Sequence, residues 1–311
     1  MELSVVTTMY YSAPYLQEFY RRITQESKKL TDNYEIIFVN DGSPDNSLKF
    51  SVALCQDDPK ICVVDLSRNF GHHRAMMTGL QYAKGDLVFL IDCDLEETPE
   101  LLSKFHQKLT SESVDVVYGV QKKRRGSWFE KVSGEIYYWL LNSLSGINFP
   151  KNVVTARLMS QRYVKSLLRH RERELTIAGL WHITGYEQRA VIIDKHDKRK
   201  TTYNFFRKLR IFINSIVSFS DRLLILIFYS GVSISLISMC FIINIIFRKL
   251  TSGIDVIGWT SVIVSIWLVG GLILSSLGII GLYISKIFIE TKQRPYSITR
   301  AVYRRSTISE K

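Results

Sequence analysis

The stretch Leu87–Glu97, LVFLIDCDLEE, places carboxylates directly after a run of five apolar residues. A short apolar run bounded by polar residues is typical of a buried β-strand. Asp92 and Asp94 follow this run at positions i and i+2, where both carboxylates can coordinate one divalent cation. Hard oxygen ligands of this kind suit Mg²⁺ or Mn²⁺, with phosphate oxygens completing the coordination shell. The alternative is a pair of helix-capping aspartates ahead of Glu96 and Glu97.

Five short apolar runs occur in the first half of the chain, at 3–8, 35–39, 61–65, 87–91 and 114–118. Helix-compatible stretches separate the first four of them. Apolar strands that alternate with helices predict an α/β domain built on a mainly parallel sheet with both faces covered. Ligands bind such sheets outside the carboxyl ends of the strands, and Asp92 and Asp94 fall at such an end.

Two further polar segments follow predicted strands. Asp41, in NDGS at 40–43, can accept hydrogen bonds from a nucleobase or a ribose, although a plain turn favours the same residue types. Arg68, in SRNFGHH at 67–73, can pair with a phosphate through its guanidinium fork. The two adjacent histidines of that segment can contact phosphate or cap the next helix, but they lack the spacing of a metal pair. The sequence contains no GxGxxG, GxxxxGK[ST] or GxSxG motif, so nicotinamide and P-loop signatures are absent.

Composition excludes several classes of protein. The 311 residues include 41 Lys and Arg against 29 Asp and Glu, a formal charge of +12. The mean hydropathy is nevertheless +0.04, so charged and apolar residues must occupy different parts of the chain. Sixteen Phe, 16 Tyr and five Trp exclude a disordered chain. Four cysteines in 311 residues are too few for a disulfide scaffold. They also lack the CxxC spacing that is typical of a zinc ribbon.

The C-terminal third contains two long uncharged segments, Leu223–Phe247 with 25 residues and Ile257–Ser285 with 29. A bilayer core needs about 20 apolar residues as a helix, so both segments can span; the alternative is a pair of buried core helices. Residues 194–222 hold eight basic against three acidic residues, and residues 286–311 hold seven against two. These basic flanks predict that both ends are cytoplasmic, with the loop at 248–256 on the other side.

Two segments have the composition of interfacial helices. In 203–219 apolar residues recur at helical spacing with basic residues on other faces, which predicts a helix lying among lipid headgroups or packed on the α/β domain. The aromatic segment 128–144 is compatible with membrane contact or with core packing. Gly271, Ser275 and Gly278 share one face of the second uncharged segment, which permits close packing on the first segment or on another copy of the chain.

Together these segments resemble the family 2 glycosyltransferases with the GT-A fold. They resemble in particular the subgroup that uses polyprenyl phosphates, which includes bactoprenol glucosyltransferases and dolichyl-phosphate mannose synthases. The resemblance covers nearly the whole chain. It rests on the order and spacing of NDGS at 40–43, SRNFG at 67–71, DCDLEE at 92–97, RLM at 157–159, SFS at 218–220 and IETKQRP at 289–295.

The resemblance implies an inverting transferase that moves a sugar from a nucleotide, a UDP-sugar in the first instance, onto a polyprenyl phosphate. The residues implied to bind the nucleotide sugar are Tyr10, Asp41, Arg68 and Asp92. Asp92 and Asp94 would hold Mg²⁺ or Mn²⁺ on the diphosphate, and Arg157 would lie near the acceptor phosphate. Of the Pro-x-Tyr-Asn-Glu that usually ends the first strand in this family, only Tyr10 is kept.

The implied catalytic group is Asp94, Arg157 and the position of Thr155. Relatives carry Gly-Asp-Phe-Arg-Leu-Met, in which the Asp is a proposed base, whereas residues 154–159 of this chain read VTARLM. Threonine cannot serve as a carboxylate base. A phosphate monoester has a second pKa of about 6, so the implied acceptor is largely ionised at pH 7 and is already a nucleophile. The reaction then needs departure of the nucleoside diphosphate, which metal and arginine charges assist.

The predicted organisation is a cytosolic GT-A domain at 1–202, a juxtamembrane amphipathic helix at 203–222, a two-span transmembrane hairpin at 223–285 and a basic cytosolic tail at 286–311. The chain opens on a strand, so we expect no secretory signal peptide. The expected location is the inner, cytoplasmic membrane, with both termini in the cytosol. The expected partners are a nucleotide sugar, a polyprenyl phosphate and the bilayer.

Three other classes of function stay open at this point. The threonine at position 155 is compatible with a non-catalytic membrane scaffold built on a decayed transferase. A processive polysaccharide synthase usually carries a Gln-x-x-Arg-Trp motif and more spans, and the residues before Trp181 do not match it. A nucleic-acid binder is disfavoured because the basic residues crowd the uncharged segments and are not interleaved on the α/β domain.

Overall fold

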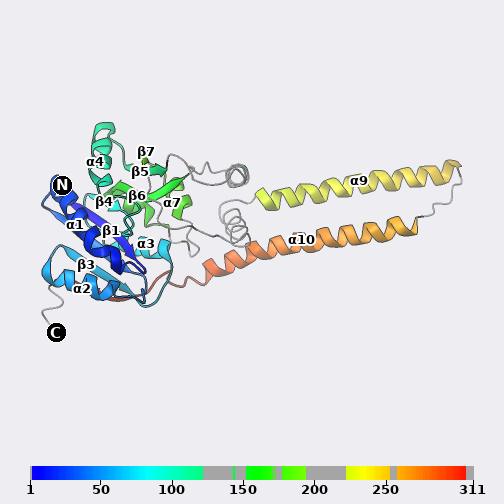
Figure 1. Cartoon of the computed structure of the whole chain (residues 1–311). Helices are drawn as coiled ribbons and strands as arrows, with labels where there is room; N and C mark the ends of the chain where they lie inside the picture. The colour runs from blue at the N-terminus through cyan, green and yellow to red at the C-terminus, as the bar shows by residue number, and fades with distance from the viewer. Residues whose placement is uncertain are drawn as a thin grey trace. The chain divides into compact units, whose positions relative to one another are not determined.

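The structure is a computed structural model that describes residues 2–121, 143, 152–170, 172, 177–193, 222–252 and 258–305 (Figure 1). The chain forms two compact units. The first comprises Met1–Tyr138, Ile147–Tyr203 and Arg294–Lys311, and the second comprises Trp139–Gly146 and Asn204–Gln293. The predicted interfacial segments at 203–219 and 128–144 lie outside the described residues, apart from Ser143.

The first unit is built on an eight-stranded sheet in the order β7-β5-β6-β4-β1-β2-β3-β8. The strands are β1 Leu3–Met9, β2 Tyr34–Asn40, β3 Ile61–Leu66, β4 Leu87–Leu90, β5 Val116–Gln121, β6 Val153–Ser160, β7 Gln188–Ile193 and β8 Thr299–Tyr303. All five apolar runs identified in the sequence contribute strands. The pairs β1-β2, β1-β4, β2-β3 and β5-β7 are parallel, whereas β3-β8, β4-β6 and β5-β6 are antiparallel. The predicted parallel sheet is therefore mixed at its flanks.

Helices cover both faces of this sheet, which explains why its central strands are buried and mainly apolar. They are α1 Ala13–Leu30, α2 Ser47–Asp57, α3 His72–Tyr82, α4 Leu101–Glu112, α6 Gln161–Leu167 and α7 Ile177–Ile183. One apolar core packs against α1, α2 and α4, and a second packs against α3, α6 and α7. Strand β4 serves both, because Phe89 belongs to the first core and Val88 and Leu90 belong to the second.

The order of the strands changes direction at β1. The chain passes from β1 to β2 and β3 on one side, and β4 then pairs on the other side of β1. Ligands of such sheets bind outside the carboxyl ends at this change of direction. The segments that begin there are those after Met9, Asn40, Leu66 and Leu90. All the polar motifs of the first hundred residues therefore converge on one edge.

Strand β8 is a feature that the sequence did not predict. Residues 299–303 lie within the segment interpreted as a basic tail, yet they pair antiparallel with β3 at the edge of the sheet. Only five residues long and carrying an arginine, TRAVY has little strand signal of its own. The chain that leaves the second unit thus re-enters the fold of the first.

The second unit contains two long helices, α9 Arg222–Ser252 and α10 Trp259–Thr291, which run in opposite directions in Figure 1. Among the described residues, Ser265–Thr291 of α10 is long and apolar enough to cross a bilayer, with a mean hydropathy of 2.0. Helix α9 contributes the shorter apolar stretch Leu224–Ile234. It also continues to Ser252, so the first residues of the predicted loop at 248–256 are helical. Among the described residues this criterion therefore supports one of the two predicted spans, in α10, and does not support the second, in α9.

Candidate active site

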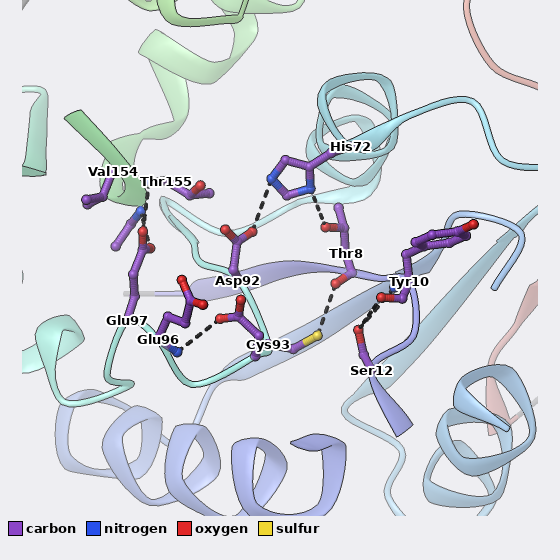
Figure 2. A network of polar contacts seen from close by, with 12 residues as sticks. Thr8, Tyr10, Ser12, His72, Asp92, Cys93, Glu96, Glu97, Val154 and Thr155 are labelled. Carbon is purple, nitrogen blue, oxygen red and sulfur yellow. Dashed lines mark hydrogen bonds and ion pairs between the residues drawn. The ribbon is translucent and has the colours of Figure 1, made fainter. Parts of the chain in front are cut away.

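Asp92 and Asp94 lie just beyond the carboxyl end of β4, and Figure 2 shows Asp92 there. Cys93 between them is buried, and its Sγ donates to the carbonyl oxygen of Thr8 at 3.1 Å, which fixes this turn against β1. The carboxylate of Asp94 accepts the backbone N–H of Glu96 at 3.0 Å. Helix α4 begins only at Leu101, so neither aspartate caps it and the capping interpretation is wrong.

The pair of carboxylates suits a cation that is shared with a ligand. Both are hard oxygen donors, and the Asp92 side chain is 22% exposed. Within the described residues there is no cluster of three or more His, Cys, Asp or Glu side chains that could hold a metal. Mg²⁺ and Mn²⁺ are commonly bound by one or two carboxylates together with substrate phosphates, and the donor set here fits that pattern.

His72, the first residue of α3, holds Asp92 in place. Its Nε2 lies 3.3 Å from Oδ1 of Asp92, and its Nδ1 lies 3.0 Å from the hydroxyl of Thr8 (Figure 2). The sequence left open whether this histidine contacts phosphate or caps the helix. In the structure it joins β1 to the first of the two carboxylates, a contact that the sequence could not specify.

Asp41 connects the NDGS segment to the SRNFG segment. Its carboxylate is buried and accepts backbone N–H groups from Phe70 at 2.7 Å and Gly71 at 3.0 Å. Burial raises the pKa of Asp41 above its ordinary value, and the two N–H donors oppose that shift. The structure thus gives Asp41 a role in fixing the loop that carries Arg68, whose exposed guanidinium lies 4.2 Å from the ring centre of Phe70.

Glycine is required where these two loops meet. Gly42 has a φ of +61°, and a Cβ at this position would collide with the backbone nitrogen of Asn69 and the carbonyl carbon of Arg68. Gly185 also has a positive φ, +77°, but a Cβ there has no heavy atom within 4 Å. The two glycines therefore differ in crowding and share the same kind of backbone conformation.

Gly42→Ala is expected to destabilise the protein by about 3 kcal/mol, because overpacking adds to the cost of a side chain at positive φ. Gly185→Ala carries the conformational cost alone, about 1 kcal/mol. Thermal unfolding of the purified protein measures both. Equal losses for the two variants would contradict the contact between the NDGS and SRNFG loops.

Two exposed tyrosines stand at the end of β1. Tyr10 is 49% exposed and Tyr11 53%, and their rings meet edge to face with centroids 4.8 Å apart. The backbone N–H of Tyr11 donates to Oγ of Ser43 at 2.8 Å, which ties the tyrosines to the NDGS loop. Exposed aromatic faces beside a polar loop can stack on a planar ring. Tyr11 is a candidate that the sequence reasoning missed, although it adjoins Tyr10.

Glu97 fastens the carboxylate loop to β6. Its buried carboxylate accepts the backbone N–H of Thr155 through Oε1 at 3.1 Å and that of Ala156 through Oε2 at 2.7 Å (Figure 2). Leu90 of β4 pairs with Arg157 of β6. The fold therefore brings together Glu97 and Thr155, which lie 58 residues apart in the sequence.

Arg157 is fully buried on the same strand and lines a cavity of about 480 Å³. Its guanidinium lies over the indole of Trp181 and donates to the carbonyl oxygens of Val154 at 3.4 Å and Thr155 at 3.3 Å. Burial lowers the pKa of Arg157 to about 9, which leaves it protonated at pH 7. Trp181 Nε1 is buried without a hydrogen-bond partner in the described part of the chain. The other lining residues are Tyr118, Val153, Ala178, His182, Gly185, Tyr186, Glu187, Gln188 and Arg189.

A mixed, Rossmann-like sheet with paired carboxylates beyond β4 is the GT-A arrangement, and it places the chain in the class of glycosyltransferases. Residues 4–170 match the family described as Glycosyl transferase family 2, and the chain belongs to this family. The predicted family and the predicted enzyme class are confirmed.

Similar proteins span the whole chain. One from Mycobacterium tuberculosis (strain CDC 1551 / Oshkosh), whose name places it among the glycosyltransferases, is 50% identical over 97% of this chain and 89% of its own length. The uncharacterized glycosyltransferase YkcC of Bacillus subtilis (strain 168) is 33% identical over 97% of this chain and 94% of its own. The SfII prophage-derived bactoprenol glucosyl transferase of Shigella flexneri is 28% identical over 98% and 99%.

Proposed function

We propose that the chain is a membrane-anchored inverting glycosyltransferase that moves a sugar from a nucleotide sugar, a UDP-sugar in the first instance, to a polyprenyl phosphate. The main support is the convergence of three features on one edge of the sheet: the Asp92–Asp94 pair, the loops around Asp41 and Arg68, and the strand that carries Thr155. The similarity to a bactoprenol glucosyl transferase over nearly the full length of both chains agrees with a lipid acceptor.

The donor half of the site is assigned to the first hundred residues. Tyr10 and Tyr11 offer rings for the base, and Arg68 offers an exposed guanidinium for a phosphate. Asp92 and Asp94 would hold Mg²⁺ or Mn²⁺. A divalent cation there would neutralise charge that develops on the departing diphosphate. Asp41 contributes by fixing the Arg68 loop.

The acceptor half is assigned to β6 and the cavity beside it. A phosphate monoester is largely ionised at pH 7, so it attacks the anomeric carbon without a protein base and Thr155 suffices where relatives carry an aspartate. Arg157 is itself buried and holds its positive charge at the wall of this cavity, where it attracts an anionic group because the surrounding protein screens the charge less than bulk water does. We assign the acceptor phosphate to the mouth of this cavity.

The path of the chain supports anchoring by an even number of membrane crossings. Residues 299–303 form a strand of the same sheet as residues 3–9, so both lie on the same side of any bilayer. Every crossing between them must be matched by a return. If α10 crosses the bilayer once, the matching crossing must lie in the preceding part of the second unit, where α9 is the described helix. Basic residues at both flanks favour the cytoplasmic side for the sheet.

His72→Ala is expected to raise the metal concentration that gives half-maximal transfer about tenfold, because residues that orient metal ligands typically contribute 10–100-fold to affinity. His73→Ala is the matched control, since it removes the adjacent imidazole and leaves the contact between His72 and Asp92. Titration of Mn²⁺ in the transfer assay measures the shift. A shift of less than twofold for His72→Ala would show that Asp92 does not need this support.

The decisive experiment supplies membranes that contain the chain with undecaprenyl phosphate, Mg²⁺ or Mn²⁺ and a panel of radiolabelled nucleotide sugars. We expect one donor to transfer its label to the lipid fraction through a sugar–phosphate linkage. Failure with every donor would overturn the proposal. Calorimetry with the same nucleotides then separates a non-catalytic scaffold, which binds none of them, from a transferase with another acceptor, which still binds one when metal is present.

A further inference from the structure

The segment 296–303, here called the C-terminal arm, lies against the loop that leads to Arg68. Strand β8 of the arm pairs with the end of β3, where Leu66 faces Thr299. The backbone N–H of Ser67 donates to the carbonyl oxygen of Ile298 at 2.9 Å. The arm is also tied to α3, by a hydrogen bond of 2.7 Å between the hydroxyls of Ser297 and Thr78, and by one from Gln81 to Tyr296.

Arg300 of the arm neutralises a buried carboxylate. Asp65, at the end of β3, is fully buried, and its Oδ2 accepts from Nε and Nη2 of Arg300 at 2.7 Å each. A buried carboxylate that loses its cation and hydrogen bonds is strongly destabilised. The Arg300 side chain itself is 56% exposed, so the arm can release it to water. Asp65 is therefore neutralised by Arg300 only while the arm is docked.

Asp65 in turn orients the loop after β2. Its Oδ1 accepts Nδ2 of Asn40 at 2.8 Å, and Oδ1 of Asn40 accepts the backbone N–H of Ser43 at 3.2 Å. Since the amide of Asn40 is used at both ends, its orientation is set by Asp65. Asn40 directly precedes Asp41, whose carboxylate holds the backbone of Phe70 and Gly71. Hydrogen bonds, together with the peptide bond between Asn40 and Asp41, thus connect the arm to both loops of the proposed donor site.

We propose that Arg300 is a positioning residue for the nucleotide, and that the C-terminal arm, which follows the last helix of the second unit, completes the donor site. This inference rests on the proposed function for the identity of its ligand, a nucleoside diphosphate. Docking of the arm neutralises Asp65, fixes Asn40 and shapes the NDGS and SRNFG loops. Release of the arm loosens both loops without requiring a contact between the arm and the nucleotide. Short edge strands open at lower free energy than central strands, so the arm can undock while the rest of the sheet stays folded. Because the docked arm shapes the donor loops, arm docking and nucleotide binding are coupled.

The test compares Arg300→Gln with Arg305→Gln in the detergent-solubilised full-length chain. Both variants remove one positive charge from the end of the chain, and Arg305 is exposed. We expect Arg300→Gln to weaken the Kd for UDP in the presence of Mn²⁺ about tenfold, and Arg305→Gln to leave it unchanged. The double variant Asp65→Asn with Arg300→Gln removes the buried charge and keeps an oxygen for Asn40, so it should recover most of the lost affinity. Wild-type affinity in Arg300→Gln overturns the proposal, and so does failure of the double variant to recover.

Amide hydrogen exchange without nucleotide provides a second measurement. Arg300→Gln should speed exchange at Phe70 and Gly71, whose N–H groups bond to Asp41, whereas Arg305→Gln should not. Unchanged exchange at these two amides overturns the role of the arm. A wild-type chain that binds no nucleotide overturns the proposed donor, and the exchange comparison still decides whether the arm fixes the loops. Failure of the inference and failure of the proposed function are therefore distinguishable.

Discussion

Asp92→Asn is expected to reduce the rate of sugar transfer at least about 10³-fold while leaving the fold intact. Removing one group that stabilises developing charge in a transition state costs about 10²–10³-fold. Asp92 has more than one task in the proposed site, because it would hold the divalent cation and it belongs to the loop that Glu97 fastens to β6, the strand assigned to the acceptor. Asparagine keeps the size and one oxygen of the side chain, but it loses the charge that attracts a divalent cation.

The matched control is Asp86→Asn, at the opposite end of the same strand. Asp86 lies just before β4 and accepts the backbone N–H of Glu2 at 2.9 Å, a bond that an asparagine oxygen can keep. We expect transfer by this variant to stay within about twofold of the wild type, with both variants melting near the wild-type temperature. Transfer above a tenth of the wild-type rate in Asp92→Asn would remove this carboxylate from the proposed metal site.

Much of the fold could be predicted because the residue composition of the central strands reflects their burial directly. A strand covered on both faces is mainly apolar, so β1, β2, β3 and β4 stand out as short, largely apolar runs between helices. Strand β6 carries no such signal, because it contains a buried arginine. This segment is identified in the sequence only by its RLM motif at 157–159, and no secondary structure is assigned to it there. Strands β7 and β8 lie at the two edges of the sheet, where exposure on one side admits polar residues.

From the residues alone, site residues could be predicted only where a chemically suitable side chain directly follows a predicted strand. Asp92, Asp94 and Asp41 could be placed at the carboxyl edge of the sheet because each follows an apolar run. Glu97 was missed, although DCDLEE contains it, because its role depends on the antiparallel pairing of β6 with β4, and nothing local specifies that pairing. The contact between Arg300 and Asp65 spans 235 residues and depends in the same way on an unpredicted strand.

Arg157→Met is the second variant with a large expected effect. It should reduce transfer about 10²–10³-fold, chiefly through a weaker interaction with the anionic acceptor, because the cavity loses its buried cation. Its effect on stability should have the opposite sign. Burial of a charge is costly, and replacing a buried charged group by a well-packed apolar one of similar size is often neutral or stabilising. The lowered pKa of Arg157 reports the cost of keeping this guanidinium charged away from water.

We therefore expect Arg157→Met to melt at or above the wild-type temperature while it loses activity, a combination typical of residues kept for function at the expense of stability. Arg162→Met is the control, since this exposed arginine on α6 pairs with Asp115 and lies outside the residues that line the cavity. It should keep its activity and gain no stability. A melting temperature well below the wild type for Arg157→Met would show that the guanidinium, stacked on Trp181, holds β6 and α7 together, and its burial would then be explained by packing and not by an anionic acceptor.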